Sequence, residues 1–157
     1  MGIRFSSTIT ENLKPYKLPS NWKWFLWEDI MCSYQQGMIR SNSQLGKGNV
    51  EYLKMGDIDT YGSADISNLK LTVASNDEIQ NFKLNDGDFL INVRNSFSLV
   101  GKSCVVDKTY NRDILFNHML VRIDNGSVDM NFYINAFLNI PSSKKLLDRI
   151  KEGTTTV

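Results

Sequence analysis

Residues 89–106 combine two apolar runs with a polar, cationic break between them. The break carries Arg94, Asn95, Ser96 and then Gly101-Lys102, and the whole stretch contains no acidic residue. Guanidinium, amide and ammonium groups donate hydrogen bonds to phosphate oxygens and pair with base edges. This composition therefore favours contact with a nucleic acid over metal binding or acid–base catalysis.

The sequence lacks the motifs of phosphoryl transfer and of nucleophilic catalysis. Gly101-Lys102-Ser103 is similar to the end of a P-loop, but the first glycine of that motif is Ser96 here, and a β-like run follows in place of a helix. No lysine has Asp or Glu two positions before it, as a common nuclease step requires. His118 is the single histidine, and no nucleophile elbow accompanies it. A structural role is the simpler interpretation of His118.

Metal chemistry has few candidate ligands. A structural zinc site needs about four nitrogen or sulfur ligands, whereas Cys32, Cys104 and the one histidine give three. The two cysteines are therefore predicted to be reduced thiols. Asp57, Asp59 and Asp65 lie close together and could hold Mg²⁺. Because aspartate is favoured in turns, we interpret them as turn residues and predict no cofactor.

Length and composition fit one soluble domain. A chain of 157 residues is about one domain long and buries roughly 70% of its unfolded surface. The net charge is +1, so a nucleic-acid partner would have to meet a local basic patch. No apolar run approaches the ~20 residues of a membrane span, and no signal-peptide core is present. We therefore expect a cytoplasmic protein with no membrane partner.

Hydrophobic periodicity predicts an α+β domain rather than a repeating βαβ fold. We expect a short N-terminal element with its tryptophans in the core, then a β-rich central part forming a twisted, partly barrel-like sheet, and then C-terminal helices. Residues 1–17 read as a polar lead, and 18–157 as a single domain. Ser75 is the expected N-cap of a helix, and Gly153 the expected stop of the last helix. The predicted strands are residues 50–58 (strand and turn), 69–73, 88–93, 103–106 and 115–123.

Several short motifs, taken in order, resemble landmarks of one protein family. The Arg94-Asn-Ser96 step followed by Leu99-Val-Gly-Lys102 is the most specific of them. Together they resemble the target recognition domain of the specificity subunit of type I restriction-modification systems, over residues 18–155. The other landmarks are residues 18–24, 52–58 and 84–91, Asn117-His118, Phe132-Tyr133 and Gly153-Thr154-Thr155.

The resemblance implies DNA binding without catalysis. Such a domain reads one half of a split double-stranded DNA target, beside a DNA adenine methyltransferase (modification) subunit and a restriction or translocase subunit. Arg pairs well with guanine edges, and Asn or Gln with adenine edges. Gly87 and Gly101 are assigned to backbone geometry. The predicted DNA-binding residues are Arg40, Asn42, Gln44 and Lys47 in a reading loop, Arg94 and Asn95 at the acid-free tip, and Lys54 and Lys102 for positioning on the backbone.

Two other functions stay open at this point. One is a protein-interaction module that keeps only methyltransferase docking, with residues 144–150 as the contact. The other is a small hydrolase that uses His118. Steep salt dependence of duplex binding would separate DNA recognition from the first, and the turnover of a His118→Ala variant would test the second.

Overall fold

The computed structural model describes residue 14 and residues 16–149. Most of the predicted polar lead, residues 1–17, lies outside these residues. So do Gly153, the predicted helix stop, and the Thr154-Thr155 landmark.

The larger sheet has four strands in the order β1-β7-β4-β5. All three neighbouring pairs are antiparallel, with Leu90 of β4 opposite both Cys104 of β5 and Arg122 of β7. Every residue of β4 and β5 is buried, so the hairpin predicted around residues 89–106 forms the centre of the domain. The strands are β1 (Ser33–Gln36), β4 (Phe89–Asn92), β5 (Ser103–Val105) and β7 (Leu120–Asp124).

The smaller sheet has three strands in the order β3-β2-β6. Its strands are β2 (Leu45–Leu53), β3 (Lys70–Thr72) and β6 (Ile114–Phe116). β2 runs antiparallel to β3 and parallel to β6, with Tyr52 opposite Lys70 and Leu115. Over the described residues the strands therefore form two separate sheets. The α+β class is confirmed, but the partly barrel-like sheet that we expected is not supported.

The run predicted as one strand over residues 115–123 is two strands in different sheets. The chain turns at Asn117, whose side-chain oxygen accepts a hydrogen bond from Met119 N at 2.8 Å and whose carbonyl accepts from Leu120 N at 2.9 Å. An asparagine that bonds its own downstream backbone stabilises a turn. This turn sends β6 to the smaller sheet and β7 to the larger one.

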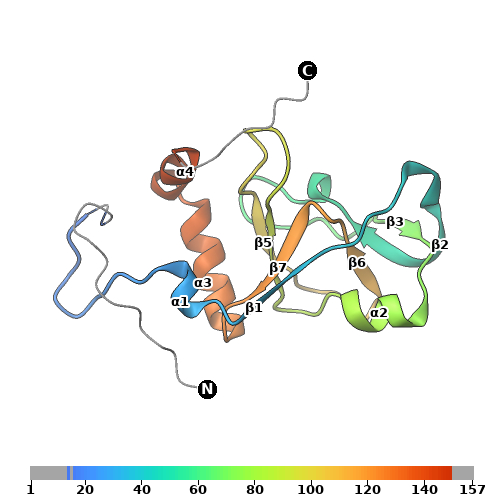
Figure 1. The fold of residues 1–157 in the computed structure, drawn as a ribbon, viewed down its shortest axis with the longest axis horizontal. Coiled ribbons are helices and arrows are strands. Elements are labelled where there is room, and N and C mark those ends of the chain that lie inside the picture. Colours follow the sequence, from blue (N-terminus) through green and yellow to red (C-terminus); the bar gives the residue numbers. More distant parts are fainter. Residues whose placement is uncertain (1–13, 15, 150–157) are drawn as a thin grey trace.

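The helices lie around the sheets (Figure 1). They are α1 (Trp27–Ile30), α2 (Asn76–Phe82), α3 (Val128–Asn139) and α4 (Pro141–Asp148), with 3₁₀ turns η2 (Asn42–Gln44) and η3 (Met55–Asp57). Ser75 caps α2 as predicted, because its hydroxyl accepts from Glu78 N at 3.2 Å while the Glu78 carboxylate accepts from Ser75 N at 2.9 Å. The two C-terminal helices are also confirmed.

The tryptophan cluster is only partly in the core. Trp27 packs on Phe89 with a ring separation of 5.9 Å, and its Nε1 donates to Asn125 at 2.8 Å. Trp24 is half-buried, but Trp22 is 55% exposed. The prediction that the tryptophans form a core anchor is therefore wrong for Trp22. Trp22 lies at the end of a turn in which the Pro19 carbonyl accepts from Trp22 N at 3.0 Å.

Strands of both sheets contribute buried apolar side chains to the core. Tyr52, Phe89 and Phe116 are the largest fully buried side chains. Cys104 is buried as well, and burial raises the pKa of its thiol to about 12, whereas Cys32 is exposed. Neither cysteine is in a disulfide, as predicted. Among the described residues, no helix combines the length and the apolar character needed to cross a bilayer.

Candidate nucleic-acid interface

Seven of the eight predicted DNA-binding residues fall on two separate parts of the surface, and the eighth, Lys54, lies between β2 and η3. Arg40, Asn42, Gln44 and Lys47 lie at the end of the domain formed by β2 and β3, on the right of Figure 1. The loop of residues 93–102 joins β4 to β5 and lies at the top of the same view. The structure therefore does not gather the eight residues into one site.

The β2–β3 ribbon is the more accessible of the two parts. We define it as residues 41–53 and 69–75. Leu45 and Val50 both pair with Thr72, so residues 46–49 leave the ladder as a bulge. Val50 and Tyr52 point into the core, whereas Gly46 to Asn49 are exposed. The ribbon thus has one buried face and one free end.

Hydrogen bonds hold the bulge in place on both sides. The Asn49 side chain donates to the Ala74 carbonyl at 3.1 Å and accepts from Ala74 N at 3.0 Å. On the other side, the Thr72 hydroxyl donates to the Gln44 carbonyl at 3.2 Å. Lys47 lies between these anchors, so its backbone position is fixed while its side chain stays exposed.

The free end of the ribbon is cationic. Residues 32–50 and 66–76 contain no Asp or Glu, and both Lys47 and Lys70 are exposed. Glu51 and Glu78 are paired with arginines, Glu51 with Arg112 at 3.0 Å and Glu78 with Arg40 at 2.8 Å. Asp65 and Asp77, which directly flank residues 66–76, are exposed. A phosphate backbone would therefore meet the exposed Lys47 at the bulge and the exposed Lys70 further along β3, opposite Tyr52. The carboxylates of Asp65 and Asp77 lie just beyond the two ends of the second segment.

Two of the four predicted reading-loop residues have side chains that bond to other parts of the domain. The Gln44 side chain caps η2, because its oxygen accepts from Ser41 N at 2.9 Å. The Arg40 side chain is only 9% exposed and is bound to Glu78. Asn42 and Lys47 remain exposed. In this arrangement Arg40 and Gln44 position the loop, while Asn42 and Lys47 are the residues with accessible side chains.

We expect Arg40→Ala to lower the free energy of unfolding by about 1–2 kcal/mol at neutral pH, because it removes a charged hydrogen bond that joins the reading loop to α2. The hydrogen bond from Ser75 N, followed by that from Arg40, holds the pKa of Glu78 below its usual value. A carboxylate with a lowered pKa stabilises the fold above its ordinary pKa and loses this effect as the pH falls towards the folded-state value.

The effect of Arg40→Ala should therefore shrink as the pH falls below about 4.5, the usual range of a glutamate. Urea unfolding at neutral and acidic pH measures both predictions. Lys47→Ala is the control, since Lys47 is exposed and its loss should leave the unfolding free energy unchanged. An equal stability loss in the two variants would contradict the structural role of Arg40.

The loop of residues 93–102 is the second candidate contact. Arg94 is exposed, whereas the Asn95 side chain accepts from Ser96 N at 2.8 Å and closes its own turn. Lys102 is half-buried and donates to the Ile58 carbonyl at 3.1 Å. Gly101 has a φ of 88°, so its predicted role in backbone geometry is confirmed, as it is for Gly87 with a φ of 93°. Arg94 is thus the freest cation of this loop.

An acid lies near this second loop. Asp59 has its pKa lowered mainly by the hydrogen bond from Ser63 N, and to a smaller extent by the charge of Lys102. Lys54 is half-buried, and its backbone N donates to Asp57 at 2.7 Å. The surroundings of Lys102 and Lys54 therefore combine both signs of charge, unlike the free end of the ribbon.

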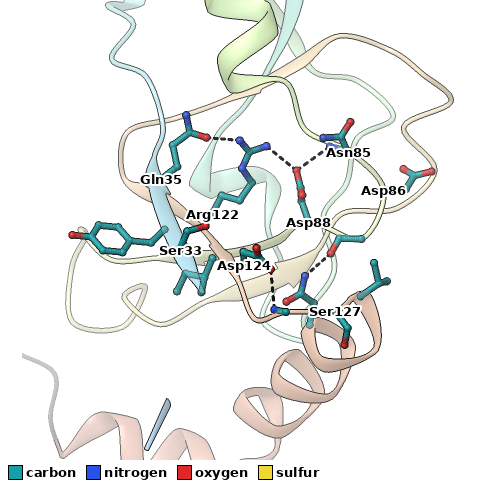
Figure 2. A pocket seen from close by; sticks show the side chains of 14 residues that line it. Ser33, Gln35, Asn85, Asp86, Asp88, Arg122, Asp124 and Ser127 are labelled. Carbon is teal, nitrogen blue, oxygen red and sulfur yellow. Dashed lines mark hydrogen bonds and ion pairs between the residues drawn. The ribbon is translucent and has the colours of Figure 1, made fainter. Parts of the chain in front are cut away.

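A polar hollow of about 730 Å³, which was not predicted, lies between β1, β7 and the start of α3. Figure 2 shows Arg122 directed towards Gln35 and Asp88, and Asp86 and Asp124 also line the hollow. Arg122 donates to Asp88 at 3.0 Å and to the Lys83 carbonyl at 2.9 Å. These contacts engage the Arg122 guanidinium within the domain. Three aspartates, Asp86, Asp88 and Asp124, line the hollow. Such a surface repels a polyanion.

The predicted turn acids are confirmed as such. Asp59 accepts from Tyr61 N and Ser63 N, and Asp65 accepts from Ser67 N at 2.9 Å. In the described part of the chain, no group of three His, Cys, Asp or Glu residues could hold a metal ion. His118 is half-buried, with no hydrogen bond to its Nδ1, and its backbone N donates to Met38.

Known proteins match this chain in fold and not in sequence. No protein-family model matches it, and no curated protein does. A chain of one solved structure is similar over 84% of the present chain, with a TM-score of 0.52 and 17% identity. That structure is described as the “structural basis underlying complex assembly and conformational transition of the type I R-M system”.

The likeness is one of fold. The present chain corresponds to 31% of the length of that neighbour. An identity of 17% does not carry the roles of individual residues from one chain to the other. The β2–β3 ribbon, which is the most accessible cationic surface among the predicted sites, is therefore assessed on its own geometry.

Proposed function

We propose that this chain recognises double-stranded DNA as the specificity component, for one half-site, of a type I restriction-modification complex, and that it does so without catalysis. The fold likeness over 84% of the chain to a chain of a type I R-M structure carries the proposal. The ordered sequence landmarks between residues 18 and 155, which resemble those of the target recognition domain of that family, support it as well.

The β2–β3 ribbon is the element that we assign to DNA. The major groove of B-DNA admits a two-stranded ribbon, and this ribbon has an exposed end without acids. Lys47 and Lys70 would contact phosphates on either side of the groove. Asn42 would present its amide to an adenine edge, which accepts and donates in the matching pattern.

The loop of residues 93–102 would add a further phosphate contact through Arg94. In the family that the sequence resembles, recognition domains act beside a DNA adenine methyltransferase subunit and a restriction or translocase subunit. We extend these partners to the present chain as part of the same proposal, with the cytoplasm as its location.

The alternative of a pure interaction module is less favoured. Its contact was expected at residues 144–150, but Ser143 is buried and the Lys144 ammonium donates to the Thr60 carbonyl. Within the described part of this segment, Lys144 is therefore engaged with the rest of the domain, whereas Lys145, Asp148 and Arg149 are exposed. Residue 150 lies outside the described residues.

Titration of a labelled duplex at two salt concentrations tests the proposal. With about three phosphate contacts, the affinity should fall roughly 40-fold between 50 and 200 mM salt, from a dissociation constant near 10⁻⁴–10⁻⁶ M. Lys47→Ala should lower the slope of log K against log salt by about 1. Salt-independent binding, or no binding at low salt, would contradict DNA recognition and favour the interaction module.

A further inference from the structure

The outer edge of β1 has no partner strand in the part of the chain that the structure describes. β1 is the first strand of the larger sheet, and its residues Ser33, Tyr34 and Gln36 are exposed. Charged side chains and prolines are among the features that keep an exposed edge from pairing with another chain, and β1 contains neither. The edge strand β3 of the smaller sheet, by contrast, carries Lys70. The edge of β1 is therefore open to a further strand.

The hydrogen-bond pattern shows which backbone groups of β1 are available. Gly37 N donates to the Leu120 carbonyl of β7 at 3.1 Å, in register with the β1–β7 ladder. In an antiparallel ladder, residues that bond to the neighbouring strand alternate with residues whose N–H and C=O point away from it. Gln35 therefore bonds to β7, whereas Tyr34 and Gln36 direct their N–H and C=O groups outwards. An added strand could bond to these groups.

The polar hollow lies beside this edge, since residues 33–35 of β1 form part of its lining. Arg122 is the one cation of the lining, and it is paired with Asp88 at 3.0 Å. Asp86 and Asp124 are exposed, and neither takes part in an ion pair between described residues. The hollow therefore presents two carboxylates that no described cation neutralises, and it is complementary in charge to a basic partner.

We propose that β1 binds an extended segment of a protein partner as an additional antiparallel strand, and that this segment carries Lys or Arg at every second position. All neighbouring strands of this sheet are already antiparallel. Ser33 lies opposite Asp124 in the ladder, and Gln35 lies opposite Arg122. These side chains share the face of the hollow (Figure 2). Residues of the added strand opposite Ser33 and Gln35 would lie on that face too, so basic side chains there would reach over the carboxylates.

The other face of the added strand would meet Tyr34. Successive side chains of a strand point to opposite faces, so Tyr34 points away from the face of Ser33 and Gln35, and its side chain is 71% exposed. Its ring offers apolar contact to the residues between the basic ones. In strand addition, main-chain hydrogen bonds give affinity and alternate side chains give specificity. The hollow shares no residue with the β2–β3 ribbon, so this inference does not depend on the proposed function.

Fluorescence anisotropy with a labelled peptide of sequence Lys-Val-Lys-Val-Lys tests the pairing. We expect saturable binding below about 1 mM at low salt, and about 5-fold weaker binding of Lys-Lys-Val-Val-Lys, which has the same charge. In antiparallel pairing the valine nitrogens face Tyr34 and the lysine nitrogens face away. Methylation of the valine nitrogens should therefore weaken binding about 10-fold, whereas methylation of the lysine nitrogens should leave it unchanged. Equal effects, or the reverse order, would overturn the proposal.

The double variant Asp86→Asn/Asp124→Asn tests the hollow. It removes both charges, but each asparagine keeps an oxygen that accepts the backbone hydrogen bond made there. We expect it to bind the alternating peptide about 5-fold more weakly. Asp59→Asn/Asp65→Asn is the matched control, because these exposed acids also accept backbone hydrogen bonds and lie outside the hollow.

The control should bind the peptide like the wild type, and circular dichroism checks that both double variants are folded. Equal losses in the two variants, or no saturable binding by the wild-type chain, would overturn the proposal. A duplex titration of the wild-type chain measures DNA binding separately. Peptide binding without duplex binding would therefore refute only the proposed function, and duplex binding without peptide binding would refute only this inference.

Discussion

Gly48→Ala is expected to lower the free energy of unfolding by about 2–4 kcal/mol and to weaken duplex binding. A Cβ atom at Gly48 would lie 2.1 Å from the Thr72 carbonyl carbon and oxygen and 2.5 Å from Val73 N. All three atoms belong to the backbone of β3 and its continuation, so no side chain can move aside. The φ of 140° at Gly48 adds strain for any residue with a side chain.

Gly46→Ala is the matched control. Gly46 lies in the same bulge and also has a positive φ, of 91°, but a Cβ there would meet nothing within 4 Å. It should cost only the conformational strain, about 1–2 kcal/mol. The difference in unfolding free energy between the two variants therefore measures the effect of the close contact between the bulge and β3, separately from the effect of the positive φ.

Urea unfolding and a duplex titration at low salt measure both effects. If the fold relieves the clash by releasing the bulge, the stability loss of Gly48→Ala will be smaller, but Lys47 will move and the affinity will still fall. Equal stability and equal DNA affinity in the two alanine variants would show that the bulge is not pressed against Thr72 and does not present Lys47.

Elements with local signals could be predicted from the sequence. Ser75 and Glu78 form a capping box within four residues, so the start of α2 was predicted. The hairpin of β4 and β5 follows from two apolar runs around a polar break, and α3 and α4 follow from helical spacing and Pro141. In each of these elements the deciding contacts are close in sequence.

Elements that depend on distant contacts could not be predicted. The parallel pairing of β2 with β6 joins Tyr52 to Leu115. β2 begins at Leu45, five residues before the predicted strand, because its bulge is held by Asn49 and Ala74, 25 residues apart. The turn at Asn117 was hidden within an apolar run whose length suited one strand.

The residue types of the candidate site could be predicted from the sequence, but the contacts of its individual side chains could not. The acid-free character of residues 33–49 was evident from the sequence and corresponds to an exposed surface. The ion pair between Arg40 and Glu78, which makes Arg40 unavailable to DNA, was not predicted. The two residues are 38 positions apart, and residue type alone does not reveal a partner. Lys70 was missed because it lies in a predicted strand, and its place on the same ribbon as Lys47 depends on the pairing of β3 with β2.

Reversal of the ribbon charges is the second large effect that we expect, and it tests the central claim most directly. The double variant Lys47→Glu/Lys70→Glu replaces two predicted phosphate contacts by two repulsive carboxylates. Both positions are exposed, so the fold should persist. Its matched control is Lys17→Glu/Lys23→Glu, which makes the same change of net charge at two exposed lysines of the N-terminal segment.

The measurement is a fluorescence titration of one labelled duplex with the wild-type chain and both variants at about 50 mM salt, where phosphate contacts dominate affinity. We expect the ribbon variant to bind about 100-fold more weakly and to lose about 2 from the salt slope. The control should stay within about 3-fold of the wild type, since net charge alone acts weakly at a distance. Unchanged affinity in the ribbon variant, or an equal loss in the control, would contradict DNA recognition through the β2–β3 ribbon.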